Sequence, residues 1–148
     1  MSKLFDVKYM DLDLNTSEKF ETIKHLANLI EERLIDVDKY VEDVKSRESI
    51  STTGIGDGVA IPHAKSSWVK VPTVVVGKSS SGIEWESLDD EPVNIVFLIA
   101  VPENGGNEHL KILQRLAISL MDDEIKEELV NATDKKVIEE LLNRNTEG

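Results

Sequence analysis

The sequence predicts an α/β protein, a single-domain three-layer sandwich in which a mixed β-sheet is flanked by helices. Three observations lead to this prediction. The 148 residues have the length of one domain. Apolar residues recur at helical spacing towards both ends of the chain, whereas the middle, from Ser49 to Val101, holds β-branched residues broken by glycine. Neither a repeat nor an interdomain linker interrupts residues 1–148, so the helices are expected to bracket one cluster of strands.

The first helix is expected to begin near Asn15, because Asn15 and Glu18 have the spacing of a capping box. A polar N-terminal arm that contains residues 4–7 precedes this helix. Its buried stripe recurs every three or four residues, at Phe20, Ile23, Ala27, Ile30 and Leu34. Asp36 can cap a second helix that ends near Arg47. The inner face of this second helix carries Val37, Tyr40, Val41 and Val44.

The middle of the chain predicts a set of strands separated by turns. Val93–Val101 is the longest apolar run, which is typical of a central strand covered on both faces. Pro72 has no N–H to donate and should sit at the start or edge of its strand. Short strands are expected at Val59–Ile61, Thr73–Gly77 and Ile83–Trp85, with turns at Gly54–Gly58 and Ser79–Gly82.

Three helices are expected after the central strand. Asn107 can cap a long one, Asp122 or Asp123 opens another through Leu129, and Asp134 opens a final one through Leu142. The inner face of the long helix is predicted to carry Leu110, Leu113, Leu116, Ala117 and Leu120.

Composition and charge exclude several classes of function. Seventeen basic and 29 acidic side chains give a net charge of −12, which argues against nucleic-acid binding and is compatible with a basic protein partner. The absence of cysteine excludes disulfides, thiolate metal sites and cysteine nucleophiles. Neither a signal-peptide pattern nor an apolar run of about 18 residues is present, so a cytoplasmic location is expected.

The segment Ser51–Ala64 carries the clearest chemical signal. Glycine occupies every second position at Gly54, Gly56 and Gly58, and a short apolar run then leads to His63. A neutral imidazole is nucleophilic near pH 7, and glycines allow backbone N–H groups to approach an anion. The segment therefore suggests a histidine that accepts and passes on a phosphoryl group. The residues alone are about equally consistent with a second interpretation, in which His63 only makes structural hydrogen bonds at the end of a strand.

The other candidate residues are less specific. His109 lies in the first turn of the helix opened by Asn107, where the helix dipole favours an anion, although it could simply be a polar residue near a cap. Arg47 could grip phosphoryl oxygens, but its position favours a cation at the C-terminal end of a helix. His25 faces away from the buried stripe and is expected at the surface.

Two other kinds of site compete with a phosphoryl carrier. The glycines do not form a nucleotide-binding motif, because Val59–Pro62 follows them instead of a helix, and no Gly-Lys-Ser/Thr occurs. A metal-dependent hydrolase would need His63 and His109 to converge with Asp57 or Glu108. The two histidines are 46 positions apart, and the sequence leaves their convergence open.

The segment Thr53–Lys65, TGIGDGVAIPHAK, resembles the signature around the active histidine of the IIA domain of the bacterial phosphoenolpyruvate-dependent sugar phosphotransferase system, fructose/mannitol type. Arg47-Glu48, the run Val93–Glu103 and Asn107–Leu113 are similar to the same family. The resemblance covers most of the chain, so it predicts one domain of this type over residues 1–148.

The resemblance implies a phosphocarrier without metal or nucleotide cofactor. His63 would accept a phosphoryl group from phospho-HPr and pass it to a cysteine of a cognate IIB domain, and contact with the membrane would run only through the IIC transporter. Arg47 and His109 match active-site positions of the family. Thr53 and Gly54 can add a hydroxyl or N–H donor.

The transported sugar is not encoded in a pocket of such a domain. Ile83–Trp85 and Phe97–Pro102 look most like fructose-type members. Mannitol, galactitol and nitrogen-related types stay open, and so does a regulatory IIA-like protein that signals through its phosphorylation state.

Overall fold

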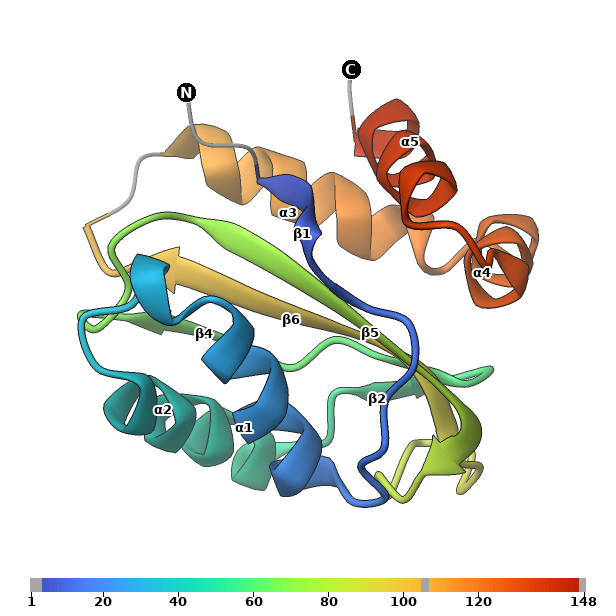
Figure 1. The fold of residues 1–148 in the computed structure, drawn as a ribbon, viewed down its shortest axis with the longest axis horizontal. Helices are drawn as coiled ribbons and strands as arrows, with labels where there is room; N and C mark the ends of the chain where they lie inside the picture. The colour runs from blue at the N-terminus through green and yellow to red at the C-terminus, as the bar shows by residue number, and fades with distance from the viewer. Residues whose placement is uncertain (1–3, 105–106, 147–148) are drawn as a thin grey trace.

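The computed structural model describes residues 4–104 and 107–146 and has the three layers that the sequence predicts. A six-stranded mixed sheet forms the middle layer. Helices α1 (Lys19–Leu29) and α2 (Val37–Ile50) cover one face. The other face is covered by α3 (Asn107–Ser119), α4 (Asp123–Asn131) and α5 (Lys135–Thr146), drawn above the sheet in Figure 1. In the part of the chain described, every helix is too short or too polar to cross a bilayer.

The sheet is organised around its longest apolar strand. The strands are β1 (Phe5–Asp11), β2 (Gly54–Gly56), β3 (Val59–Ala60), β4 (His63–Ser66), β5 (Thr73–Ile83) and β6 (Val93–Pro102). Their order is β1-β5-β6-β3-β2, and β4 also pairs with β6. Strand β6 is antiparallel to β5 and parallel to β3 and β4, which confirms the prediction of a central strand.

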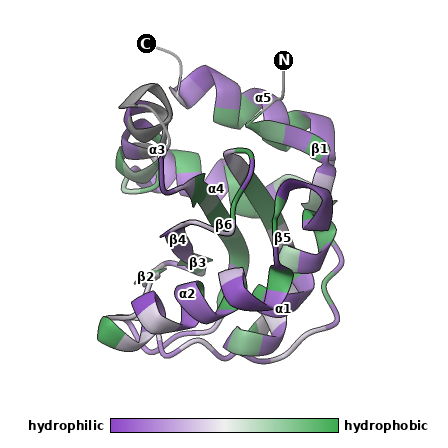
Figure 2. Ribbon diagram, turned by 90° about the vertical axis from the view of Figure 1, so that its left-hand side faces the viewer, coloured by the Kyte–Doolittle hydropathy of each residue, from purple (hydrophilic) through white to green (hydrophobic). Residues whose placement is uncertain are grey.

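Side chains of β6 alternate between two hydrophobic cores because successive residues of a strand point to opposite faces. Val96, Leu98 and Ala100 belong to the core beneath α1 and α2. Ile95, Phe97 and Ile99 belong to the core beneath α3, α4 and α5. Figure 2 shows the hydrophobic colour on β5 and β6 between the helical layers, with hydrophilic colour on the outer helix faces.

The start of α1 differs from the prediction. Its N-cap is Glu18, whose carboxylate accepts from the Glu21 N–H, so the predicted capping box at Asn15 and Glu18 is wrong. Ser17 and Glu18 are held extended because Glu84 pairs with them and donates its N–H to the Ser17 carbonyl at 3.0 Å. The predicted stripe is otherwise right, since Ile23, Ala27, Ile30 and Leu34 are buried and Phe20 packs partly buried against them.

Helix α2 begins where the sequence places it. The Asp36 carboxylate accepts from the Lys39 N–H at 3.1 Å, and the helix continues to Ile50, three residues beyond the predicted end at Arg47. Asp122 caps α4 by accepting from the N–H groups of Glu124 and Ile125. The predicted helices after Asp122 and Asp134 are therefore confirmed, with slightly later ends.

Several predicted loops belong to strands. The arm containing 4–7 continues into β1, which pairs in parallel with β5 and buries Phe5, Tyr9 and Met10. The predicted turn at Ser79–Gly82 is wrong, because these residues stay within β5 and only shift its register against β6. The predicted turn at Gly54–Gly58 is shorter than expected. Gly54–Gly56 is β2, and the turn itself is formed by Asp57 and Gly58, both with positive φ.

Helix α3 begins at Asn107 and packs against α5. Leu116 and Leu120 are buried as predicted, whereas Ala117 is exposed and that assignment is wrong. The side chains of Leu110, Leu113 and His109 lie outside the described residues.

Candidate functional site

His63 is the first residue of β4, one of the strands paired with the central strand. The sequence places it behind a strand at Val59–Ile61, but in the structure the pairing ends at Ala60, is interrupted at Ile61 and Pro62, and resumes at His63, opposite Ile99. Pro62 has no N–H for the ladder, yet its carbonyl accepts from the Ile99 N–H at 2.9 Å. His63 is thus held by the sheet, and the prediction of a histidine behind its strand is corrected.

A backbone contact fixes the tautomer of the His63 ring. Nδ1 lies 2.8 Å from the carbonyl oxygen of Ile61. A carbonyl only accepts hydrogen bonds, so Nδ1 carries the proton and Nε2 of the neutral ring keeps its lone pair. Among the described residues Nε2 has no hydrogen-bond partner, and the side chain is half-buried. The geometry therefore identifies Nε2 as the nitrogen that can act as the nucleophile.

His63 lines an open hollow of about 590 Å³ between β4 and α2, and most of the residues that line it are polar or charged. Helix α2 contributes Asp43 and Arg47, which lie one turn apart on the same face. Its other lining residues are Ala64, Lys65, Ser66, Ser67, Trp68 and Glu103. The structure therefore brings two of the predicted site residues, His63 and Arg47, to one hollow.

Two hydrogen bonds lock α2 to the strands around His63. The Tyr40 hydroxyl donates to the carbonyl of Ile99, the register partner of His63, at 2.9 Å. The Ser66 hydroxyl donates to Oδ2 of Asp43 at 2.6 Å. Burial raises the pKa of Tyr40, so its hydroxyl stays a donor across the neutral and alkaline range. The relative position of Arg47 and His63 is thus set by contacts on two sides.

Arg47 keeps most of its hydrogen-bonding capacity. One guanidinium nitrogen, Nη1, donates to the Ser51 carbonyl at 2.9 Å near the C-terminal end of α2. No carboxylate lies within 4.0 Å of it in the described part of the chain. A guanidinium has five N–H groups, so Arg47 can act both at the helix end and on an anion in the hollow.

Thr53 and Gly54 do not line this hollow. The N–H and the hydroxyl of buried Thr53 both donate to the Glu48 carboxylate, at 2.8 and 2.5 Å. The Gly54 N–H donates to the hydroxyl of Thr52 at 3.1 Å. A donor role towards a phosphoryl group stays a prediction for both, and it would require these bonds to be exchanged.

Glu48 is a structural residue that the sequence analysis missed. Glu48 is only 4% exposed, and its carboxylate also accepts from the indole N–H of Trp85. Through its bonds to Thr53 it joins the end of α2 to the glycine-rich segment. Its position four residues after the buried Val44 was the available signal, because the two share a helix face.

His109 belongs to the first turn of α3, and its own side chain is outside the described residues. Helix α3 does approach His63, because a second, apolar hollow of about 250 Å³ is lined by His63 and Ile99 from the sheet and by Gln114 and Ala117 from α3. His63 therefore borders α2 on one side and α3 on the other.

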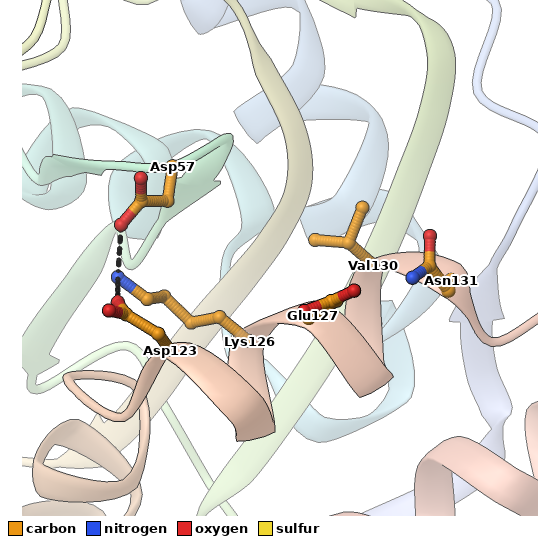
Figure 3. A pocket seen from close by; sticks show the side chains of 6 residues that line it. All are labelled: Asp57, Asp123, Lys126, Glu127, Val130 and Asn131. Carbon is orange, nitrogen blue, oxygen red and sulfur yellow. Dashed lines mark hydrogen bonds and ion pairs between the residues drawn. The ribbon is translucent and has the colours of Figure 1, made fainter.

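A third hollow, of about 380 Å³, lies between the Asp57 turn and α4 (Figure 3). Lys126 reaches across from α4 and bonds to Asp57 and Asp123. The hydrogen bond that Lys126 donates to the Asp57 carboxylate raises the pKa of Lys126. Asp57, one of the candidate metal ligands, is thus paired with a cation. The described residues contain no group of three His, Cys, Asp or Glu side chains that could hold a metal ion.

The His63 imidazole has no hydrogen-bond partner on Nε2 among the described residues, and it shares its hollow with a guanidinium that has no ion-pair partner there. Such an arrangement is typical of a protein that carries a small anionic group on a histidine. Residues 3–145 match the family described as "Phosphoenolpyruvate-dependent sugar phosphotransferase system, EIIA 2". The chain belongs to this family, and it is accordingly a phosphotransferase component that works through a phosphohistidine.

Two curated relatives carry fructose-specific names. The chain is 36% identical over 147 residues to the fructose-specific EIIABC component of Bacillus subtilis, covering 98% of this chain and 23% of that protein. It is 35% identical over 144 residues to the fructose-specific EIIA component of Haloferax volcanii, covering 96% of this chain and 94% of that protein. The Haloferax relative therefore has nearly the length of this chain.

Among solved structures, the nitrogen regulatory protein IIA-Ntr from Neisseria meningitidis superposes with a TM-score of 0.85 at 27% identity. The match covers 94% of this chain and 96% of that one. The three-layer fold is thus shared along almost the whole of both chains.

Proposed function

We propose that His63 is the phosphorylated residue of this IIA protein, and that Nε2 accepts a phosphoryl group from phospho-HPr and gives it to the cysteine of a cognate IIB domain. The observation that carries the proposal is the hydrogen bond from Nδ1 to the Ile61 carbonyl, which leaves the Nε2 lone pair without a partner among the described residues. This chain has no cysteine, so the acceptor must belong to another domain or chain.

The proposed transfer consists of two successive displacements at phosphorus. The Nε2 lone pair of His63 attacks phosphorus, the P–N bond of the donor phosphohistidine breaks, and its electron pair returns to the donor ring. Nδ1 keeps its proton against the Ile61 carbonyl throughout. In the second step a thiolate attacks phosphorus, and the electron pair of the P–Nε2 bond returns to His63. No metal or nucleotide takes part.

Arg47 is proposed to stabilise the charge on the phosphoryl oxygens. Its guanidinium lines the same hollow as His63 and has free N–H groups that suit two oxygens at once. His109 is proposed to support the same group from the start of α3, where the helix dipole favours an anion. Both interactions would act mainly during transfer, when positioning and charge stabilisation lower the barrier.

The test is labelling by phospho-HPr of the wild type and of two histidine variants. His63→Ala should abolish acid-labile phosphate uptake, whereas His25→Ala should label normally, because His25 bonds to Asp11 of β1, away from the hollow. Full labelling of His63→Ala would refute the assignment.

Fructose uptake is the proposed physiological process, because two relatives at 36% and 35% identity are named fructose-specific. Such a role would place the protein in the cytoplasm. A regulatory function is the second candidate, favoured by the structural similarity to IIA-Ntr. Transfer from the phosphorylated chain to a fructose-type IIB domain would support the first, and failure with every sugar-type IIB domain would favour the second.

A further inference from the structure

Asp43 has no role in the function proposed above, yet it lines the same hollow as His63 and Arg47. Its carboxylate is half-buried, and within the described residues no Lys, Arg or His nitrogen lies within 4.0 Å of it. A negative charge without a cation partner therefore faces the space that a phosphoryl group would enter.

The missing partner is notable because a suitable cation lies one turn away. An aspartate followed four residues later by an arginine normally forms a favourable pair on a helix surface. Here the Ser66 hydroxyl holds Oδ2 of Asp43 at 2.6 Å, and the Ser51 carbonyl accepts from Nη1 of Arg47 at 2.9 Å. The two bonds keep the acid and the base apart, although both side chains line one wall.

Ser66 is well placed to hold Asp43 in this way. It is 2% exposed, lies on β4 three residues after His63, and its oxygen also accepts from the Trp68 N–H at 3.1 Å. A hydroxyl has one hydrogen to donate, and it is used on Asp43. Asp43 is therefore fixed relative to the strand that carries His63. The other acidic lining residue, Glu103, is exposed, and its side chain has no hydrogen bond or ion pair among the described residues.

We propose that Asp43, held by Ser66, is a positioning and charge-setting residue that keeps the phosphoryl-transfer potential of His63 high. This role of Asp43 rests on the proposed function of His63. A phosphoryl group brings additional negative charge into a hollow whose ionised lining residues, Asp43, Arg47, Lys65 and Glu103, sum to zero. A fixed carboxylate repels that charge, so the phosphorylated form is stabilised less and gives up its phosphoryl group more readily. Because Ser66 prevents Asp43 from neutralising Arg47, the guanidinium stays available.

The test measures the equilibrium between phospho-HPr and this chain in Asp43→Asn. Asparagine keeps the shape and an oxygen acceptor for Ser66 but removes the charge. The equilibrium should shift towards the phosphorylated chain by about threefold to tenfold. The matched control is Glu42→Gln, the same charge change on the neighbouring exposed residue, which should shift it little. An unchanged equilibrium in Asp43→Asn overturns the proposal.

A second measurement tests the part played by Ser66. Ser66→Ala should free Asp43 to pair with Arg47 and slow phosphoryl uptake several-fold, and adding Asp43→Asn in the same chain should restore the rate. A merely structural role of Ser66 predicts no such rescue, and its absence counts against the proposal. Failure of the wild type to accept phosphate on His63 would instead refute the proposed function, so the two failures are distinguishable.

Discussion

At the scale of single residues, the hydrogen bond of 2.8 Å between Nδ1 of His63 and the Ile61 carbonyl decides which ring nitrogen can act. A histidine without such a contact would exchange between two tautomers. The contact is local, because Ile61 lies only two residues before His63, on the other side of Pro62. The proline break between β3 and β4 thus brings the carbonyl next to the ring.

Arg47 provides the clearest prediction at this scale. Arg47→Ala should lower the rate of phosphoryl uptake by about 10- to 1,000-fold, because it removes a charge that stabilises the transferring group. The fold should be retained, since the only hydrogen bond of Arg47 among the described residues goes to the carbonyl of Ser51. Rapid-quench labelling measures the rate of phosphoryl uptake, and circular dichroism measures whether the fold is retained. A normal rate in a folded variant would rule out the proposed role.

At the scale of elements, the glycine-rich segment is held from two directions. Glu48 at the end of α2 binds Thr53 at its start, and Lys126 of α4 binds Asp57 at its turn. Asp89 accepts from the Asp57 N–H at 3.0 Å and adds a third contact. The segment leading to His63 is therefore tied to helices on both faces of the sheet.

The contact between Lys126 and Asp57 predicts a pH dependence of stability. The hydrogen bond that buried Lys126 donates to Asp57 raises the pKa of Lys126, so its stabilising contribution is fully present below the unfolded value of 10.5 and is lost as pH rises through the higher folded value. The difference in unfolding free energy between the wild type and Lys126→Met should therefore shrink above about pH 10.5.

Urea unfolding from about pH 7 to about pH 12 measures this difference. Lys136→Met is the matched control, because Lys136 is an exposed lysine of α5 whose side chain is 69% accessible. A difference for Lys126→Met that stays constant up to pH 12 would contradict the assignment.

The sequence predicted those elements whose residues show their environment directly. Val93–Val101 is apolar because β6 is covered on both faces, and Asp36 and Asp122 are caps that act within one turn. Ser79–Gly82 is predicted to be a turn, but it continues β5 as an irregular stretch between the pairs Lys78–Ile95 and Ile83–Val93. The pairs on either side of this stretch keep it in the strand, and the local propensity of its polar residues does not reveal them.

The candidate site was likewise predicted only in part. The glycine pattern and the resemblance singled out His63 and Arg47, and the structure places both at one hollow. The sequence does not predict the contact of Asp43 with Ser66, because it depends on how α2 lies against β4, 23 residues further along the chain. It does not predict the contact of Glu48 with Thr53 either, because this contact depends on how the chain turns after α2.

At the scale of the whole molecule, the net charge of −12 is relevant to encounters with partners. A strongly acidic carrier attracts a basic donor over distances comparable to the Debye length. Phosphoryl uptake at donor concentrations below saturation should therefore slow by about tenfold when salt rises from about 0.05 to about 0.5 M. The second-order rate constant measures this effect, and a rate independent of salt would show that charge does not guide the encounter.

The three-layer arrangement places His63 between α2 and α3, where it borders one polar and one apolar hollow. A partner can thus reach the ring without opening either hydrophobic core. Transfer requires two successive partners to meet the same nitrogen, and an open position at the edge of both layers suits this requirement.

The most direct measurement is nitrogen NMR of the imidazole rings after incubation with phospho-HPr. The account predicts phosphorus on Nε2 of His63, with Nδ1 still protonated. Phosphorus on Nδ1, on His25 or on His109, or an unmodified His63, would contradict it.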